Sequence, residues 1–276
     1  MPLPHYYTSL SPFREVFLTG RPVLTYHHVG NRPRGTRIKG LYVSPKLFSR
    51  QMAELDAAGF STAAYQSITS PVEILKKQVF LSFDDGFRDV FENALPIMRR
   101  HEFCGIQFLV SGLLGKTNEW QEREGDVSEP LMDEAQVRDW LAAGHEIGSH
   151  TLSHPHLTGL AAPAAREEIR ASKQQLEDRF GSAIKHFCYP YGDWNESVRG
   201  LVKEAGYETA CTTESGVNSG TGDRFALKRF TARYRSRNWK SLRSWLRWKF
   251  FGSSRPTVSP EVIPSSGPGK PASPRD

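Results

Sequence analysis

Residues 79–86, with the sequence VFLSFDDG, decide the fold. The run VFLSF is rich in β-favouring residues and predicts a strand, which ends at two adjacent aspartates and a glycine. Like charges this close together are costly unless something uses them. Asp84 and Asp85 are therefore candidates for cation binding and for general-base catalysis, and the alternative is a turn that carries two solvated acids.

Strand-like and helix-like segments alternate on both sides of this run. Strands are predicted at residues 23–26, 104–110, 145–148, 184–189, 207–212 and 225–232. Helices are predicted at residues 44–59, 88–101, 133–143, 163–180 and 195–205, and residues 111–130 are a polar insertion. This alternation indicates a parallel α/β architecture, and an α/β barrel carries its chemistry in the loops that follow its strands.

The composition excludes several classes of protein. The 276 residues are 38% hydrophobic and 24% charged, and no run approaches the roughly 20 apolar residues of a membrane-spanning helix. Three cysteines without a CxxC pair exclude a zinc ribbon and fit a reducing compartment. The N-terminus lacks a basic start followed by an apolar block, so we expect no cleaved signal peptide and a cytoplasmic protein.

The positive charge is concentrated late in the chain. Residues 224–260 contain 11 Lys and Arg and no acidic residue, whereas residues 1–223 are mildly acidic. Enzymes that act on nucleic acids are more often basic around the active site, so we expect no nucleic-acid partner. Residues 252–276, rich in Pro and Ser, are predicted to be a disordered tail.

Within the basic stretch, residues 238–251 (NWKSLRSWLRWKFF) predict an amphipathic helix with most of its aromatic and leucine residues on one side. One interpretation is the last helix of the barrel, packed on the body through that side. The other is an interfacial helix on an anionic membrane, with Lys and Arg facing acidic lipid. The second interpretation would place the protein at the inner face of the membrane.

Histidines follow another predicted strand in the segment SHTLSHPHL. The spacing of His150 and His154 can direct both imidazoles at one ion, and Asp85 would complete a set of two nitrogens and one oxygen. Polar loop histidines, or His156 as a ligand, are the alternatives. Pro155 turns the chain between His154 and His156, which favours the first pair.

Two more strand ends carry residues that can do chemistry. His27 and His28 follow the first predicted strand, and the alternative is one core and one surface histidine. The turn YPYG at residues 189–192 could present a free backbone N–H to an oxyanion, although a plain turn explains the same residues. In a barrel, all of these strand ends meet at one face.

The order LSFDDG, HTLSH and YPYG resembles the polysaccharide deacetylases of carbohydrate esterase family 4, which share the NodB homology domain. The segment YHHV at residues 26–29 is similar to an element of one branch of that family. The resemblance spans roughly residues 21–235 and implies a distorted (β/α)7 barrel. It leaves residues 1–20 as an N-terminal extension, residues 236–251 as the basic amphipathic helix and residues 252–276 as the tail.

The resemblance implies a metal-dependent hydrolase that removes N-acetyl groups from an N-acetylated saccharide or polysaccharide. It implies that Asp84 is the catalytic base and that the Tyr191 backbone N–H belongs to the oxyanion hole. The ligands of a divalent metal, usually zinc, would be Asp85, His150 and His154. A non-catalytic glycan-binding relative and a metal-dependent hydrolase of another class, such as a phosphoesterase, are the competing hypotheses.

Two positions depart from the family pattern. Cys188 occupies the place of an arginine that pairs with the catalytic base, and a thiol cannot form that pair. Arg229, in ALKRFTAR, is the candidate replacement, with an ordinary surface arginine as the alternative. The late histidine that serves as general acid is missing, because no histidine follows His186, and His27 is the candidate for that role.

Overall fold

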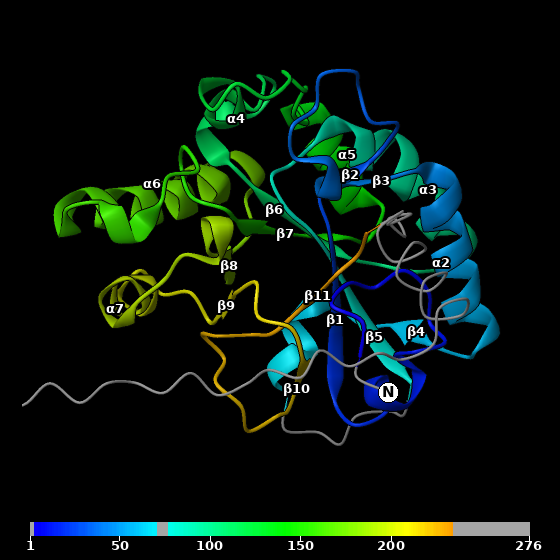
Figure 1. The fold of residues 1–276 in the computed structure, drawn as a ribbon. Helices are drawn as coiled ribbons and strands as arrows, with labels where there is room; N and C mark the ends of the chain where they lie inside the picture. The colour runs from blue at the N-terminus through cyan, green and yellow to red at the C-terminus, as the bar shows by residue number, and fades with distance from the viewer. Residues whose placement is uncertain (1–2, 71–76, 234–276) are drawn as a thin grey trace, which may run out of the picture. The chain divides into compact units, whose positions relative to one another are not determined.

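Seven parallel strands form the frame of the molecule in the computed structural model, which describes residues 3–70 and 77–233. Six of them pair in the order β1-β5-β6-β7-β8-β9, and β11 pairs with β1. In Figure 1 the blue β1 lies between β5 and β11, and β8 and the yellow β9 lie together on the left. The strands are β1 (Arg21–Tyr26), β5 (Gln78–Phe83), β6 (Ile106–Leu109), β7 (Glu146–Ser149), β8 (His186–Cys188), β9 (Thr209–Cys211) and β11 (Phe230–Thr231).

The sheet curls, and the segment 227–231 connects its two ends. Leu227 forms a parallel bridge with Cys211 in β9, and Phe230 in β11 pairs with Leu24 in β1. The predicted α/β fold with a curled, barrel-like sheet is confirmed.

The strand predicted at residues 225–232 is shorter in the structure. The N–H groups of Lys228 and Arg229 bond to the Asn218 side chain and the Glu214 carbonyl, so they cannot take part in a regular ladder.

Three further strand pairs extend the frame. β10 (Val217–Asn218) runs antiparallel to β1, and β4 (Ser61–Thr62) runs parallel to β5. β2 (His28–Val29) and β3 (Tyr42–Val43) form a separate pair just after β1. This pair fixes the direction in which the chain leaves the end of β1.

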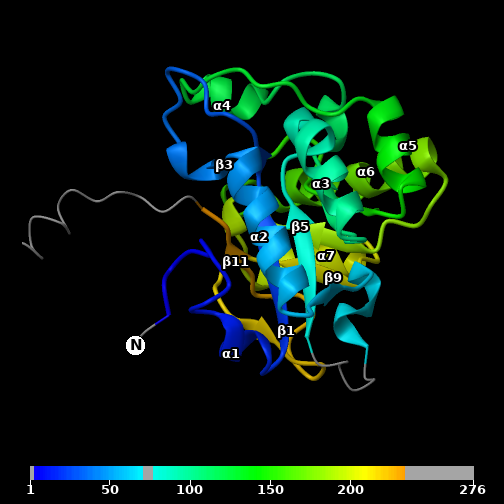
Figure 2. The ribbon, with the colours of Figure 1, turned by 90° about the vertical axis from the view of Figure 1, so that its right-hand side faces the viewer.

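Three of the described helices begin at a residue whose side chain caps the first turn. Ser44 accepts a hydrogen bond from the N–H of Leu47, Asp133 forms a capping box with Gln136, and Asn195 accepts the N–H of Val198. Figure 2 shows α2 and α3 in front of β1 and β5. The helices are α1 (Arg14–Phe17), α2 (Pro45–Ala57), α3 (Leu95–Arg100), α4 (Glu119–Arg123), α5 (Glu134–Ala142), α6 (Ala162–Phe180) and α7 (Glu196–Glu204).

The helix predicted at residues 88–101 is divided. Its first part, Val90–Ala94, is a turn of π-helix, and α3 follows it. Pro96 has no N–H to donate to the carbonyl four residues earlier, so regular α-helical bonding is interrupted there.

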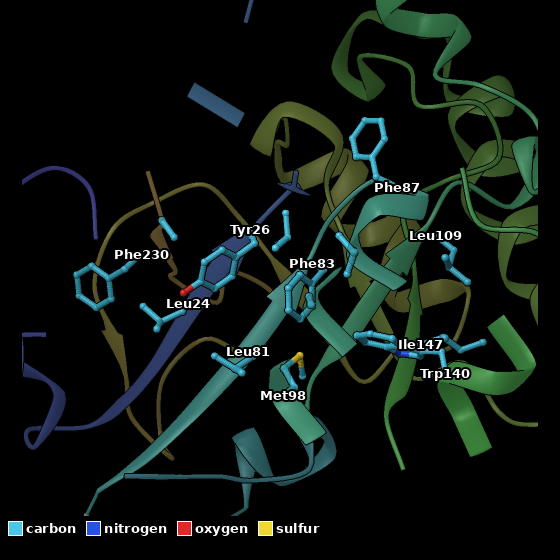
Figure 3. Packing of buried hydrophobic residues seen from close by; sticks show 14 of the residues in the cluster. Leu24, Tyr26, Leu81, Phe83, Phe87, Met98, Leu109, Trp140, Ile147 and Phe230 are labelled. Atoms are coloured by element: carbon cyan, nitrogen blue, oxygen red, sulfur yellow. The ribbon is translucent and has the colours of Figure 1, made fainter. Parts of the chain in front are cut away.

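Aromatic side chains fill much of the core. Tyr26 and Phe83, at the ends of β1 and β5, stack with ring centroids 5.5 Å apart (Figure 3). Phe13 and Phe17 pack on Phe230, at 5.3 and 5.5 Å, although residues 1–20 are predicted to be an extension. These N-terminal aromatic residues are therefore part of the same core as the barrel.

The predicted amphipathic helix at residues 238–251 and the predicted tail at residues 252–276 lie outside the described residues. Within residues 3–70 and 77–233, no helix combines the length and apolar character needed to cross a membrane.

Candidate active site

The ends of the parallel strands bring the predicted site residues into one pocket of about 340 Å³. This volume lies in the range of small-molecule sites. His27 follows β1, the two aspartates follow β5, the histidine pair follows β7, and Tyr191 follows β8. The pocket is lined by His27, Asp84, Asp85, His150, His154, Tyr191 and Arg229, among others.

Asp85, His150 and His154 converge on one point. The Asp85 Oδ1 atom lies 3.3 Å from the Nε2 atom of each histidine, and all three side chains are buried. Oδ1 has no hydrogen-bond partner among the described residues. Two imidazole nitrogens and one carboxylate oxygen form the ligand set of a catalytic zinc site, which keeps a position free for water. These residues therefore fit a divalent metal.

A second contact fixes the tautomer of His150. Its Nδ1 atom lies 2.7 Å from the carbonyl oxygen of Cys188, which can only accept a hydrogen bond. Nδ1 therefore carries the proton, and the lone pair of Nε2 faces Asp85. A metal-binding histidine typically donates its other N–H in this way.

Electrostatics keep the Asp85 carboxyl ionised. Burial raises its pKa, but without a metal the N–H groups and positive charge of His150 and His154, when they are protonated at Nε2, outweigh burial and hold the pKa well below its usual range. An ionised oxygen is the form that binds a cation.

The loop that carries the two histidines is held from α6. Glu168 accepts hydrogen bonds from the N–H groups of Leu152 and Ser153, at 3.0 and 2.9 Å. The Thr151 hydroxyl accepts the N–H of His154 at 3.0 Å. These contacts position His150 and His154 relative to each other without using either imidazole.

Three of the predicted site residues have a left-handed backbone. The φ angles are 74° at Asp85, 64° at His154 and 60° at Tyr191, and none of these residues is glycine. This conformation is uncommon for such residues and persists only where the surroundings impose it. At these three positions the conformation accompanies side chains that line the pocket.

Arg229 and Asp84 form a buried pair with two parallel contacts. Nη1 donates to Oδ1 at 2.7 Å and Nη2 donates to Oδ2 at 2.8 Å. Nε also donates to the Thr212 carbonyl, and Arg229 is only 2% exposed, so it is not a surface arginine. Burial raises the pKa of the Asp84 carboxyl, but Arg229 and His27 lower it more, so its net shift is downward.

The two adjacent histidines have different environments. The His27 ring is 20% exposed and its Nε2 lies 3.7 Å from Asp84 Oδ2, and burial lowers its pKa. His28 is buried, stacks on Tyr42 and Phe87, and faces Asp89 at 3.0 Å. Only His27 lines the pocket.

The turn after β8 depends on Gly192. Its φ angle is +72°, and a Cβ there would lie 2.2 Å from the Thr213 hydroxyl oxygen. The backbone N–H of Tyr191, one residue earlier, has no acceptor among the described residues. The Tyr191 ring lies over the exposed His156, which stands outside the metal-ligand cluster.

Two aromatic contacts of the site were not predicted from the sequence. Trp120 stacks on the His154 ring with centroids 4.5 Å apart, and Tyr6 lines the pocket from the N-terminal segment. Trp120 lies in the insertion at residues 111–130, whose polar composition gave no sign that it reaches the site. The only signal was a buried-type side chain in an otherwise polar stretch.

A sequence profile of the family described as polysaccharide deacetylase matches residues 72–210. The chain belongs to the polysaccharide deacetylase family. This match confirms the resemblance drawn from LSFDDG, HTLSH and YPYG. It also confirms the predicted class of enzyme, because the members of the family are polysaccharide deacetylases.

The sequence identity to individual relatives is low. The chain is 26% identical to YxkH of Bacillus subtilis, which is named as a polysaccharide deacetylase, over 75% of this chain and 70% of that one. It is 24% identical to the poly-β-1,6-N-acetyl-D-glucosamine N-deacetylase of Staphylococcus aureus, over 64% of this chain and 63% of the relative.

Solved structures share the fold. The Streptococcus pyogenes deacetylase PplD, in complex with acetate, matches with a TM-score of 0.68 and 22% identity, over 78% of this chain and 92% of that one. IcaB from Ammonifex degensii matches with a TM-score of 0.67 and 20% identity, over 82% and 96%. These matches support the barrel-like deacetylase fold.

Proposed function

We propose that this chain removes N-acetyl groups from an N-acetylated glycan, with a divalent metal, zinc, held by Asp85, His150 and His154. The observation that carries the proposal is the convergence of Asp85 Oδ1 on both Nε2 atoms beside the Asp84–Arg229 pair. The staphylococcal relative acts on an N-acetylglucosamine polymer, which makes such glycans the first substrates to test.

The residues divide the chemistry between them. When bound, the metal polarises the acetamide carbonyl and lowers the pKa of water. Asp84, held ionised by Arg229, accepts the proton of the attacking water. The Tyr191 N–H donates to the oxygen that becomes negative in the transition state.

His27 is proposed to protonate the leaving amine. Burial lowers its pKa, so the ring is mainly neutral at neutral pH and must gain a proton during turnover. Asp84 Oδ2, 3.7 Å from His27 Nε2, is close enough to supply the proton it has accepted. The same small set of groups would then serve both halves of the hydrolysis.

The test is acetate release by the purified protein from chitooligosaccharides and from β-1,6-linked N-acetylglucosamine oligomers. We expect release that stops after treatment with a chelator and returns with zinc. Bound metal without acetate release from any glycan would favour a glycan-binding relative, and phosphate release from phosphoesters would favour a phosphoesterase.

A further inference from the structure

A second arginine stands at the outer part of the pocket. Arg229, Thr231 and Arg233 line the pocket at alternate positions, whereas Phe230 and Ala232 are buried in the core. This alternation is that of an extended segment, in which four residues span about 13 Å. Arg233 is therefore placed to meet a part of the substrate that lies beyond the reacting acetamide.

The Arg233 guanidinium is held in place by two neutral groups. Its Cζ atom lies 3.8 Å from the centre of the Tyr6 ring, which is a cation–π contact. A Cβ on residue 40 would lie 2.6 Å from the same Cζ atom, so Gly40 leaves the room that the guanidinium fills. The guanidinium is thus positioned by the Tyr6 ring on one side and by the Gly40 backbone on the other.

No acidic group of the described residues compensates this charge. Arg233 forms no ion pair with residues 3–70 or 77–233, and its Nε atom is buried without a hydrogen-bond partner. Arg229, by contrast, is paired with Asp84, and the half-buried Arg199 is paired with Asp223 at 2.7 Å. A positioned guanidinium without an acid is suited to an anion from outside the chain.

We propose that Arg233 binds an anionic group, a carboxylate or a phosphate, carried by the glycan next to the sugar that is deacetylated. The planar guanidinium matches both groups with two parallel hydrogen bonds. The inference rests on the proposed function, because it names the class of glycan that the same pocket takes. It separates this chain's substrate from a wholly neutral polymer of N-acetylglucosamine.

The test compares three probes on the zinc-loaded protein. Tetra-N-acetylchitotetraose is neutral, a tetrasaccharide of alternating N-acetylglucosamine and N-acetylmuramic acid carries carboxylates, and a phosphate monoester of tetra-N-acetylchitotetraose carries phosphate. We expect Arg233→Met to raise KM for at least one anionic probe about tenfold or more and to leave the neutral probe unchanged. The probe that is affected identifies carboxylate or phosphate.

Two further variants serve as controls. Arg224→Met removes the same charge from an exposed side chain outside the pocket and should change no probe. Arg233→Lys should keep part of the preference, because the charge remains while the planar fork is lost. Salt should raise KM for the anionic probe in the unchanged protein and have little effect in Arg233→Met.

The proposal is overturned if Arg233→Met changes all three probes by the same factor, or changes none. Calorimetry of the same probes with chelator-treated protein measures, separately from turnover, whether Arg233 strengthens the binding of an anionic glycan. If no probe releases acetate, the proposed function fails, and Arg233 is then judged by binding alone. Equal binding of neutral and anionic probes would contradict the role of Arg233.

Discussion

Arg229 and Asp84 lie 145 residues apart in the chain and form a bidentate ion pair inside the barrel, at 2.7 and 2.8 Å. Both side chains are almost completely buried. Removing one partner of such a pair leaves an uncompensated buried charge, which lowers the stability of the folded protein far more than removing both partners does.

We therefore expect Arg229→Met to lower the free energy of unfolding by about 3 kcal/mol and to reduce turnover strongly. Adding Asp84→Asn to that variant should recover part of the lost stability. Urea unfolding of the two single variants and the double variant measures the coupling. Strictly additive losses would mean that the two charges do not stabilise each other.

The role of Arg229 could be predicted only because Cys188 stands where the family pattern has the arginine that pairs with the catalytic base. In the structure the Cys188 sulfur lies 3.2 Å from Arg229 Nη2, so the small thiol leaves space for the guanidinium that comes from the later strand. No periodicity or spacing in the sequence connects positions so far apart. The pairing follows from the closure of the sheet between β9 and β1.

The grouping of His27, Asp84, Asp85 and His150 could be predicted more directly. Each residue follows a strand, and the carboxyl ends of parallel strands meet at one face. Trp120 and Arg233 could not, because α4 is a five-residue helix in a polar insertion and Arg233 depends on Tyr6 and Gly40. Contacts of this kind are decided by tertiary packing rather than by local pattern.

The metal ligands can be separated from their neighbours by a matched pair of variants. His154→Ala should lose bound zinc and acetate release together, because one of three converging ligands is gone. His156→Ala should keep both, since that ring is exposed and lies outside the cluster. Metal analysis of the two purified proteins provides the measurement. Full zinc occupancy in His154→Ala would show that His154 is not a ligand.

Two buried histidines away from the pocket should govern stability in mild acid. Burial lowers the pKa of His145 and of His186 to about 4, from an ordinary 6.5. Between pH 6.5 and 4 these two histidines are protonated in the unfolded chain but remain neutral in the folded chain. The free energy of unfolding therefore falls as the pH drops through this window. Each histidine contributes roughly 3 kcal/mol of this loss.

We expect His186→Gln to make the decline between pH 6.5 and 4 less steep by about one proton. Urea unfolding of chelator-treated protein at several pH values gives the slopes. An identical slope in His186→Gln and in the unchanged protein would show that His186 takes up its proton in the folded state.

The division of labour between Asp84 and Asp85 is the central claim, and one measurement tests it most directly. Zinc content and acetate release are determined together in Asp84→Asn, with circular dichroism as the check on folding. The account predicts full zinc occupancy, because Asp85 and both histidines remain, and a loss of turnover of about 10²- to 10⁴-fold. Near-normal turnover, or loss of the metal from a folded protein, would contradict it.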